Sequence, residues 1–197
     1  MNKNNLYDNY EHQMAYHCAP TIKGIKCGSM VAFKINSDDS FQDFMQKHHT
    51  CFKCHGIKYL MLSRQKRHAL MLFYRPKLLT RLLRRPLAID ILKSFGYPVE
   101  KGISEESLPV LLDRLKKRIA ECDGFPHEIG IFLGYPPADV QGFIKNKGQN
   151  YLYSGFWKVY SNEAAQKHLF ECYNNCINNM CARLKSGESL QDLISAA

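Results

Sequence analysis

The sequence predicts an α+β protein, in which several helices cover a small, mostly antiparallel sheet. Helical spacing is clearest at Leu108, Leu111 and Leu115, which form one apolar stripe. Two short apolar runs, 58–62 and 69–74, are separated by a basic, polar turn, which is the pattern of a β-hairpin. The chain has 197 residues, 45% of them hydrophobic, with no repeat or low-complexity linker, so a single domain over 1–197 is expected.

The N-terminal segments are expected to form two helices separated by irregular backbone. Residues 7–16 have a helical pattern, and Pro20 is expected to end that helix because proline lacks the N–H that an interior turn needs. Two glycines make segment 22–33 a loop or an irregular strand. A second helix is then expected over residues 41–52.

The hairpin is expected to lead directly into a basic helix. Its second strand, 69–74, is apolar enough to lie at the centre of a sheet. Segment 76–86 is bounded by prolines and places its leucines at helical spacing, so it predicts a short amphipathic helix. The basic residues on its other face are Lys77, Arg81, Arg84 and Arg85.

The C-terminal half is expected to be mostly helical. A helix over 87–95 is expected to end at Gly96, as helices often do, and Ser107 is expected to cap the helix that follows it. Two short helices, a strand, a long helix and a terminal helix are then expected at 126–133, 136–144, 155–160, 162–184 and near Leu190.

The net charge of +9 raises the question of an acidic partner. Basic residues cluster at 64–68, 77–85 and 116–118. A solvated face above buried leucines explains such clusters without a ligand. The alternative is an anionic ligand, an acidic partner or a nucleic acid.

Hydropathy favours a cytoplasmic protein without a membrane segment. No apolar run approaches the roughly 20 residues that cross a bilayer, and the first residues lack the apolar core of a signal peptide. Eight cysteines in a reducing compartment are then expected to be thiols or metal ligands.

Segment 17–21, His-Cys-Ala-Pro-Thr, is the first candidate site. Cys18 and His17 are predicted to be catalytic, because a thiol becomes a nucleophile when a nearby cation stabilises its thiolate. Thr21 and Lys26 are predicted to bind a ligand. The alternative is a small buried cysteine beside a hydrogen-bonded histidine.

The second candidate site is segment 125–137, with the sequence Phe-Pro-His-Glu-Ile-Gly-Ile-Phe-Leu-Gly-Tyr-Pro-Pro. His127 is the third predicted catalytic residue, and Glu128 is placed with it in the first turn of a helix, where free N–H groups favour anions. Both segments are expected to converge on one cleft. The other predicted ligand-binding residues are Arg75, Tyr135, Trp157, Lys158 and Tyr160. Alternatively, the charge of Glu128 merely interacts favourably with the helix dipole, and the aromatic residues fill the core.

Segment 51–55, Cys-Phe-Lys-Cys-His, matches the pattern of covalent haem attachment, but that chemistry needs an exported chain. A zinc or iron site made by this segment with His48 and His49 would lack a second paired motif. We therefore predict no metal ligands, and the sequence names no cofactor.

Several segments together resemble a bacterial family of unknown function, DUF3793. They are 17–26, 73–77, 96–97, 125–137 and 155–160, in the same order and over nearly the whole chain. The chain departs from the family pattern at 27–30, Cys-Gly-Ser-Met, where a Pro-Ala-Asn-Leu type of segment is expected. The resemblance implies no defined activity. It implies a link to iron or flavodoxin physiology in anaerobic bacteria, with a flavodoxin or an iron-system protein as partner.

Two main classes of function remain open at this point. The first is a protein, an enzyme or not, that binds a small anionic or redox-related ligand at a Cys/His site. The second is a nucleic-acid-binding protein, for which the short helices joined at Gly134 resemble a helix-turn-helix. The second of these helices offers little beyond Gln141 and Lys145 to read bases, so nucleic acid ranks lower. A structural adaptor without catalysis is a further alternative.

Overall fold

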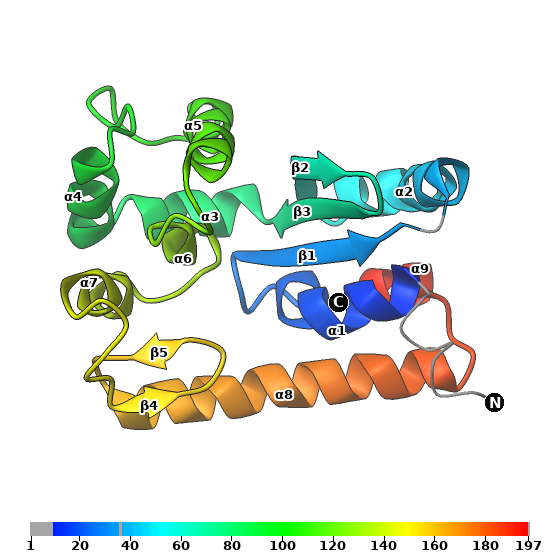
Figure 1. Cartoon of the computed structure of the whole chain (residues 1–197). Helices are drawn as coiled ribbons and strands as arrows, with labels where there is room; N and C mark the ends of the chain where they lie inside the picture. Colours follow the sequence, from blue (N-terminus) through cyan, green and yellow to red (C-terminus); the bar gives the residue numbers. More distant parts are fainter. Residues whose placement is uncertain (1–9, 36, 197) are drawn as a thin grey trace. The chain divides into compact units, whose positions relative to one another are not determined.

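The computed structural model describes residues 10–35 and 37–196, and the predicted start of the first helix at residues 7–9 lies outside them. Contacts between Cα atoms group the chain into two compact units, residues 1–75 with 173–197, and residues 76–172. The helices and two small antiparallel sheets confirm the α+β fold class (Figure 1). The single domain over 1–197 stays a prediction.

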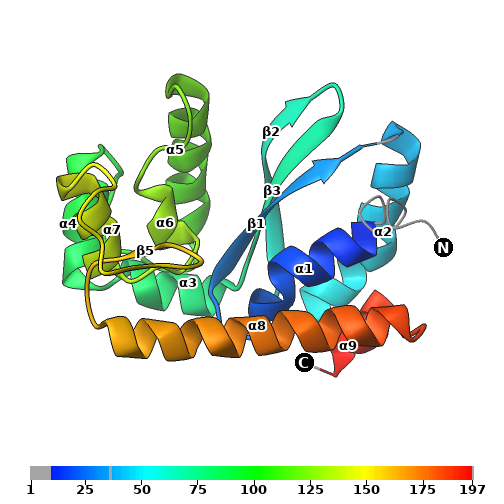
Figure 2. The ribbon, with the colours of Figure 1, turned by 60° about the horizontal axis from the view of Figure 1, so that its bottom comes forward.

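The first unit contains a three-stranded antiparallel sheet. Its strands are β1 (Gly28–Lys34), β2 (Lys58–Gln65) and β3 (His68–Tyr74), in the order β1-β3-β2. β2 and β3 form the predicted hairpin, which Figure 2 shows, and β3 is the predicted central strand, which Figure 1 shows between its two neighbours. Paired residues of an antiparallel sheet share a face, so the opposed Val31 and Met71 both point into the core.

Helices of the first unit cover the apolar face of this sheet. α1 (Tyr10–Ile22) packs against β1 and β3, and α9 (Leu190–Ser195) contacts both α1 and α2 (Asp38–Cys54). The ring of Phe52 in α2 lies 5.6 Å from that of Phe73 in β3. The predicted helices at 41–52 and near Leu190 are thus confirmed.

Pro20 corrects one prediction, because α1 continues through it to Ile22. Ala19, Pro20, Thr21 and Ile22 are all buried, so packing of this last turn outweighs the loss of one backbone N–H. The chain then turns at Gly24, which has a φ of +73°.

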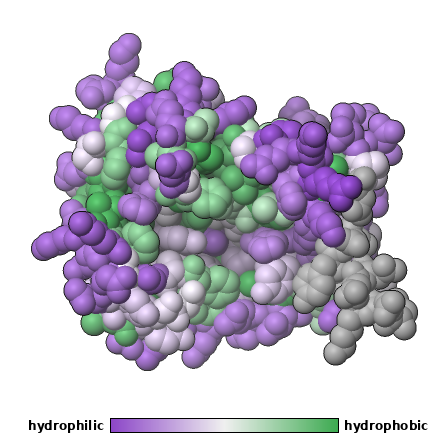
Figure 3. Space-filling model, viewed as in Figure 1, coloured by the Kyte–Doolittle hydropathy of each residue, from purple (hydrophilic) through white to green (hydrophobic). Residues whose placement is uncertain are grey.

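The second unit is mostly helical. Its helices contact one another in the pairs α3–α4, α3–α6, α4–α7 and α6–α7, and α7 also contacts β5. The elements are α3 (Pro76–Leu83), α4 (Pro86–Ser94), α5 (Leu108–Glu121), α6 (Ile129–Phe132), α7 (Pro137–Lys145), β4 (Tyr153–Ser154) and β5 (Lys158–Val159). The long helix α8 (Glu163–Lys185), predicted at 162–184, begins in this unit. In the part of the view where Figure 1 draws α4, α5 and α6, hydrophobic side chains reach the surface between hydrophilic ones (Figure 3).

Three details of this unit differ from expectation. The helix expected over 126–133 has only the four residues of α6, and the strand expected over 155–160 is replaced by the β4–β5 hairpin. Ser107 does not cap α5 with its side chain, because its hydroxyl accepts a hydrogen bond from the N–H of Ser104 instead. In contrast, α3 has the predicted amphipathic form, with Leu79 and Leu83 buried.

Candidate functional site

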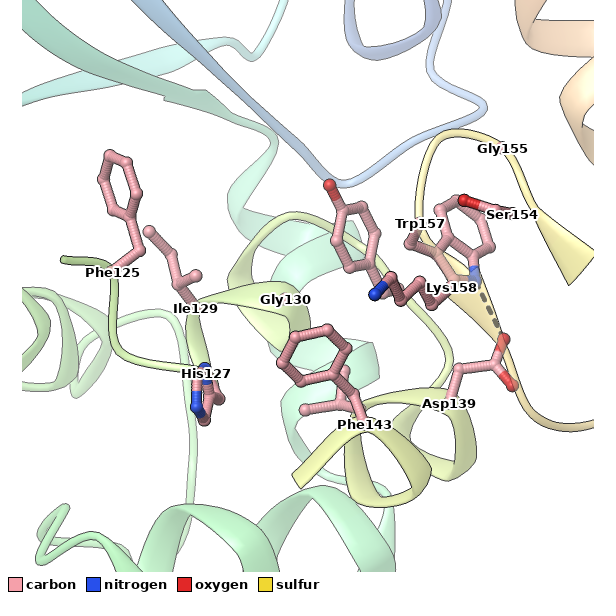
Figure 4. Close-up of a pocket in the computed structure, with 12 residues that line it drawn as sticks. Phe125, His127, Ile129, Gly130, Asp139, Phe143, Ser154, Gly155, Trp157 and Lys158 are labelled. Carbon is pink, nitrogen blue, oxygen red and sulfur yellow. Dashed lines mark hydrogen bonds between the residues drawn. The ribbon is translucent and has the colours of Figure 1, made fainter. Parts of the chain in front are cut away.

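A pocket of about 360 Å³ lies within the second unit, between α6, α7 and the β4–β5 hairpin (Figure 4). This volume is near the lower end of the range of small-molecule sites, roughly 300–1,000 Å³. The pocket is lined by Phe125, His127, Ile129, Gly130, Tyr135, Asp139, Val140, Phe143, Ser154, Gly155, Trp157 and Lys158. Most of these side chains are apolar or aromatic, so polar recognition depends on few groups.

Stacked aromatic rings form one wall of the pocket. Tyr135 and Trp157 lie with ring centroids 4.7 Å apart and an interplanar angle of 26°. The edge contact of Trp157 with Phe170 of α8, at 4.5 Å, supports the wall from behind. His127 and Phe143 meet edge to face at 5.1 Å elsewhere in the lining.

Glycines permit these close contacts. A Cβ atom on Gly130 would lie 2.9 Å from the ring of Tyr135 and 3.0 Å from a methyl group of Val140. A Cβ atom on Gly142 of α7 would lie 2.5 Å from Tyr160. The contacts with Tyr135 and Tyr160 are shorter than carbon atoms tolerate, so the backbone and these two rings can approach only because the glycines have no side chains.

Asp139 of α7 accepts hydrogen bonds from the β4–β5 hairpin and from the residues that follow it. One of its carboxylate oxygens, Oδ2, accepts a hydrogen bond from Trp157 Nε1 at 2.8 Å. The other, Oδ1, accepts from the N–H of Tyr160 and of Ser161 at 2.9 Å each, and from Ser161 Oγ at 2.8 Å. Asp139 is 1% exposed. The negative charge is thus compensated within the protein.

Lys158 supplies a positive charge at the pocket. Its Nζ donates a hydrogen bond to the carbonyl oxygen of Gly148 at 2.7 Å. The same atom lies 4.9 Å from the ring centroid of Tyr151 and 5.9 Å from that of Phe143. An ammonium group has three N–H donors, so within the described part of the chain two of them remain for a ligand.

Four predicted site residues, His127, Tyr135, Trp157 and Lys158, meet in this pocket. Burial raises the pKa of the Tyr135 hydroxyl, so that it stays protonated at neutral pH. Figure 4 shows His127, Phe125 and Ile129 on one side of the pocket and Trp157 and Ser154 on the other.

Glu128 and Tyr160 do not belong to the pocket lining. Glu128 is fully buried, precedes α6, and accepts hydrogen bonds on Oε1 from Arg118 Nε at 2.9 Å and from the Tyr97 hydroxyl at 3.2 Å. His127 also precedes α6, so the placement of both residues in the first turn of a helix is corrected. The hydrogen bond from Arg118 to Glu128 raises the pKa of Arg118, whereas burial, followed by the Glu128 charge, raises that of Tyr97.

The segment with Cys18 lies in the first unit. Cys18 is fully buried in the hydrophobic core, and burial raises the pKa of its thiol far above the ordinary value. Thr21, also buried, shares a hydrogen bond of 2.8 Å with the hydroxyl of Ser29. Burial and the raised pKa of Cys18 favour the alternative of a small buried cysteine over the prediction of a nucleophile, because a nucleophilic cysteine needs an accessible thiolate. The convergence of Cys18 with His127, which lies in the second unit, stays a prediction.

Lys26 and His17 lie near Cys18. Burial lowers the pKa of the Lys26 amine, while the thiols of Cys18 and Cys27 act in the opposite direction. The Nζ atom of Lys26 lies 5.7 Å from the ring centroid of Tyr173. Partial burial and then the Lys26 charge lower the pKa of His17. The charge of Lys26 thus acts on both His17 and Cys18, while the predicted site roles of these three residues stay predictions.

Arg75, a predicted ligand-binding residue, binds the protein's own backbone. Its Nε donates to the carbonyl oxygen of Thr21 at 2.7 Å, and its Nη1 donates to that of His55 at 2.9 Å. Its Nη2 donates to the carbonyl oxygen of Ile22. A guanidinium group therefore compensates the C-terminal ends of α1 and α2, where carbonyl groups lack helical partners.

Segment 51–55 ends α2. Cys51 Sγ lies 3.8 Å from His55 Nδ1, and Cys54 is exposed. Within residues 10–35 and 37–196, no group of three or more His, Cys, Asp or Glu side chains could hold a metal ion. None of the described helices is both long and apolar enough to cross a membrane.

Fold and site together define an α+β protein with an aromatic pocket that carries one lysine. The chain belongs to the family described as "Protein of unknown function (DUF3793)", whose model matches residues 14–194. No curated protein and no solved structure matches the chain. The expected family is confirmed, and it brings no activity with it.

Proposed function

We propose that this protein binds a small organic anion in the pocket formed by α6, α7 and the β4–β5 hairpin. The observation that carries the proposal is the Lys158 ammonium group, which lies over two aromatic rings and uses one of its N–H donors internally. An anion placed here would complete the hydrogen bonding of Lys158 in largely apolar surroundings, where such bonds are strong.

The remaining charges favour an anion over a cation. Asp139 is the one carboxylate among the described lining residues, and four hydrogen bonds already occupy it. A cationic ligand would therefore meet Lys158 without a free counter-charge. His127, exposed at the pocket, adds a hydrogen-bonding group that also suits an anion.

The proposal concerns binding and does not assign catalysis to Cys18. The burial of that thiol and the direction of its pKa shift support a structural role. A link to iron or flavodoxin physiology has its support in the resemblance alone. For nucleic acid, α6 is a single turn of four residues, which is short for the first helix of a helix-turn-helix.

Fluorescence of Trp157, the single tryptophan of the chain, offers a direct test. We would titrate the protein with benzoate and hexanoate and with the neutral amides benzamide and hexanamide. A carboxylate should bind more tightly than its amide, and Lys158→Met should weaken carboxylate binding by about tenfold or more, because a hydrogen bond to a charged group contributes roughly 1.5–3 kcal/mol.

Lys145→Met is the matched control, since Lys145 is exposed at the end of α7 and does not line the pocket. It should bind the carboxylates as the unmodified protein does. Equal affinity for carboxylates and amides, or equal losses in both variants, would refute the proposal. Circular dichroism of Lys158→Met would verify that the fold is retained.

A further inference from the structure

We infer that the anion bound in this pocket carries a planar aromatic ring and a single negative charge, as an aromatic monocarboxylate does. This inference rests on the proposed function and names the chemical class of its ligand. It follows from three features of the second unit: the aromatic lining, the number of uncompensated charges, and the position of Lys158 relative to Phe143.

The lining offers ring surfaces on several sides. Phe125 is 51% exposed and lies with Ile129 on one side of the pocket, while Phe143 lies nearer its centre (Figure 4). The stacked pair of Tyr135 and Trp157 closes another side. A flat ring can contact several of these surfaces at once, because aromatic pairs favour edge-to-face and offset-stacked contacts. A flexible aliphatic chain would gain no such contacts and would lose more rotational freedom.

The charges in the lining set the charge of the ligand. Lys158 is the one lysine or arginine among the lining residues that the structure describes, and the charge of Asp139 is compensated internally. A ligand with two or three negative charges, such as a dicarboxylate or a nucleoside polyphosphate, would bury charge without a partner. A single carboxylate matches the single ammonium group.

The spacing of Lys158 and Phe143 connects these two features. Nζ of Lys158 lies 5.9 Å from the centroid of the Phe143 ring. Aromatic rings pair with centroids roughly 4.5–7 Å apart, and a charged N–H···O bond spans about 2.7–2.9 Å. A carboxylate attached directly to a ring can therefore reach Lys158 while that ring contacts Phe143. The ammonium group of Lys158 also lies 4.9 Å from the ring centroid of Tyr151. This contact helps to orient the ammonium group in the unliganded protein.

Isothermal titration calorimetry with four probes would test the inference. Benzoate has the ring and one charge, cyclohexanecarboxylate has the charge without the aromatic ring, benzamide has the ring without the charge, and phthalate has a second charge. Benzoate should bind about three- to tenfold more tightly than cyclohexanecarboxylate, the range expected of one aromatic pair. Phthalate should gain nothing over benzoate.

Phe143→Leu should remove the preference for benzoate over cyclohexanecarboxylate. The readout is the ratio of the two affinities in the same variant, because Phe143 also lies beside Lys158 and its replacement can shift the affinity for both carboxylates together. Phe156→Leu is the control, because Phe156 is a partly exposed ring outside the lining, and it should keep the preference. Equal binding of benzoate and cyclohexanecarboxylate, or much tighter binding of phthalate, would overturn the aromatic monoanion and leave the anion site standing. Failure of every carboxylate to bind would instead refute the proposed function itself.

Discussion

Replacing Asp139 by asparagine should destabilise the second unit through one specific hydrogen bond. The amide can place its oxygen where Oδ1 accepts from Tyr160 and Ser161. Its NH₂ group must then occupy the place of Oδ2. In the unmodified protein, Nε1 of Trp157 donates to Oδ2 over 2.8 Å, so in the variant the indole N–H would face the NH₂ group. Two donors would oppose each other in a buried position.

The magnitude follows from these contacts. The lost hydrogen bond to a charged acceptor contributes roughly 1.5–3 kcal/mol, and the unpaired buried donor adds part of its desolvation cost. We expect Asp139→Asn to lower the free energy of unfolding by about 2–4 kcal/mol. Asp139→Ala, which leaves all four donors without an acceptor, should lower it by about 3–5 kcal/mol.

Urea denaturation followed by far-UV circular dichroism would measure these changes. Adding Trp157→Phe to Asp139→Asn removes the opposing indole N–H, so the double variant should recover about 1–2 kcal/mol relative to additivity. Asp113→Asn is the control, because Asp113 is exposed and pairs with Lys117 on the surface of α5. It should change the stability by less than about 0.5 kcal/mol. An Asp139→Asn protein as stable as this control, or additive effects in the double variant, would refute the reasoning.

The remaining predictions concern Arg75, Cys18 and the domain organisation. Arg75→Gln should lower the free energy of unfolding by about 2–4 kcal/mol in urea denaturation, because three backbone carbonyl groups lose a charged donor; an unchanged stability would contradict this role. Native Cys18 should resist alkylation by iodoacetamide at pH 8, while the exposed Cys54 reacts, as peptide mass spectrometry would reveal. Since burial raises the folded pKa of Cys18 above its unfolded value near 8.5, its contribution to stability is complete below that pH and decreases above it. Between pH 7.5 and 9.5 the protein should therefore lose about 1 kcal/mol more than Cys18→Ala, and parallel losses would count against the buried thiol. If residues 1–197 form one domain, urea transitions seen by Trp157 fluorescence and by circular dichroism should coincide, whereas separate midpoints would indicate two domains.

The elements predicted correctly are those whose signal is local. The hairpin of β2 and β3 and the amphipathic helix α3 depend on residue spacing within short segments, which can be read directly from the sequence. Pro20 was misjudged because the decisive contribution, burial of the last turn of α1, comes from parts of the chain that are remote in sequence.

The pocket lining was also predicted only in part, because contacts between segments remote in sequence leave no local signal. Aromatic residues and a lysine beside turns indicate a pocket, and His127, Tyr135, Trp157 and Lys158 do line one. Asp139 gave no such signal, because two of its four hydrogen-bond donors are backbone N–H groups some 20 residues away, and residue type does not reveal backbone direction. Glu128 was assigned to a ligand because its true partners, Arg118 and Tyr97, lie in other segments.

The contact between Gly142 and Tyr160 limits how this protein can be engineered for thermal stability. A glycine inside a helix usually invites replacement by alanine, which gains roughly 0.5–1 kcal/mol of helix propensity. Here the new methyl group would enter space that Tyr160 already fills, at 2.5 Å from its Cβ and Cγ atoms. The clash would push the chain next to Lys158 away from α7. Automated consensus or propensity-based redesign should therefore leave this glycine unchanged.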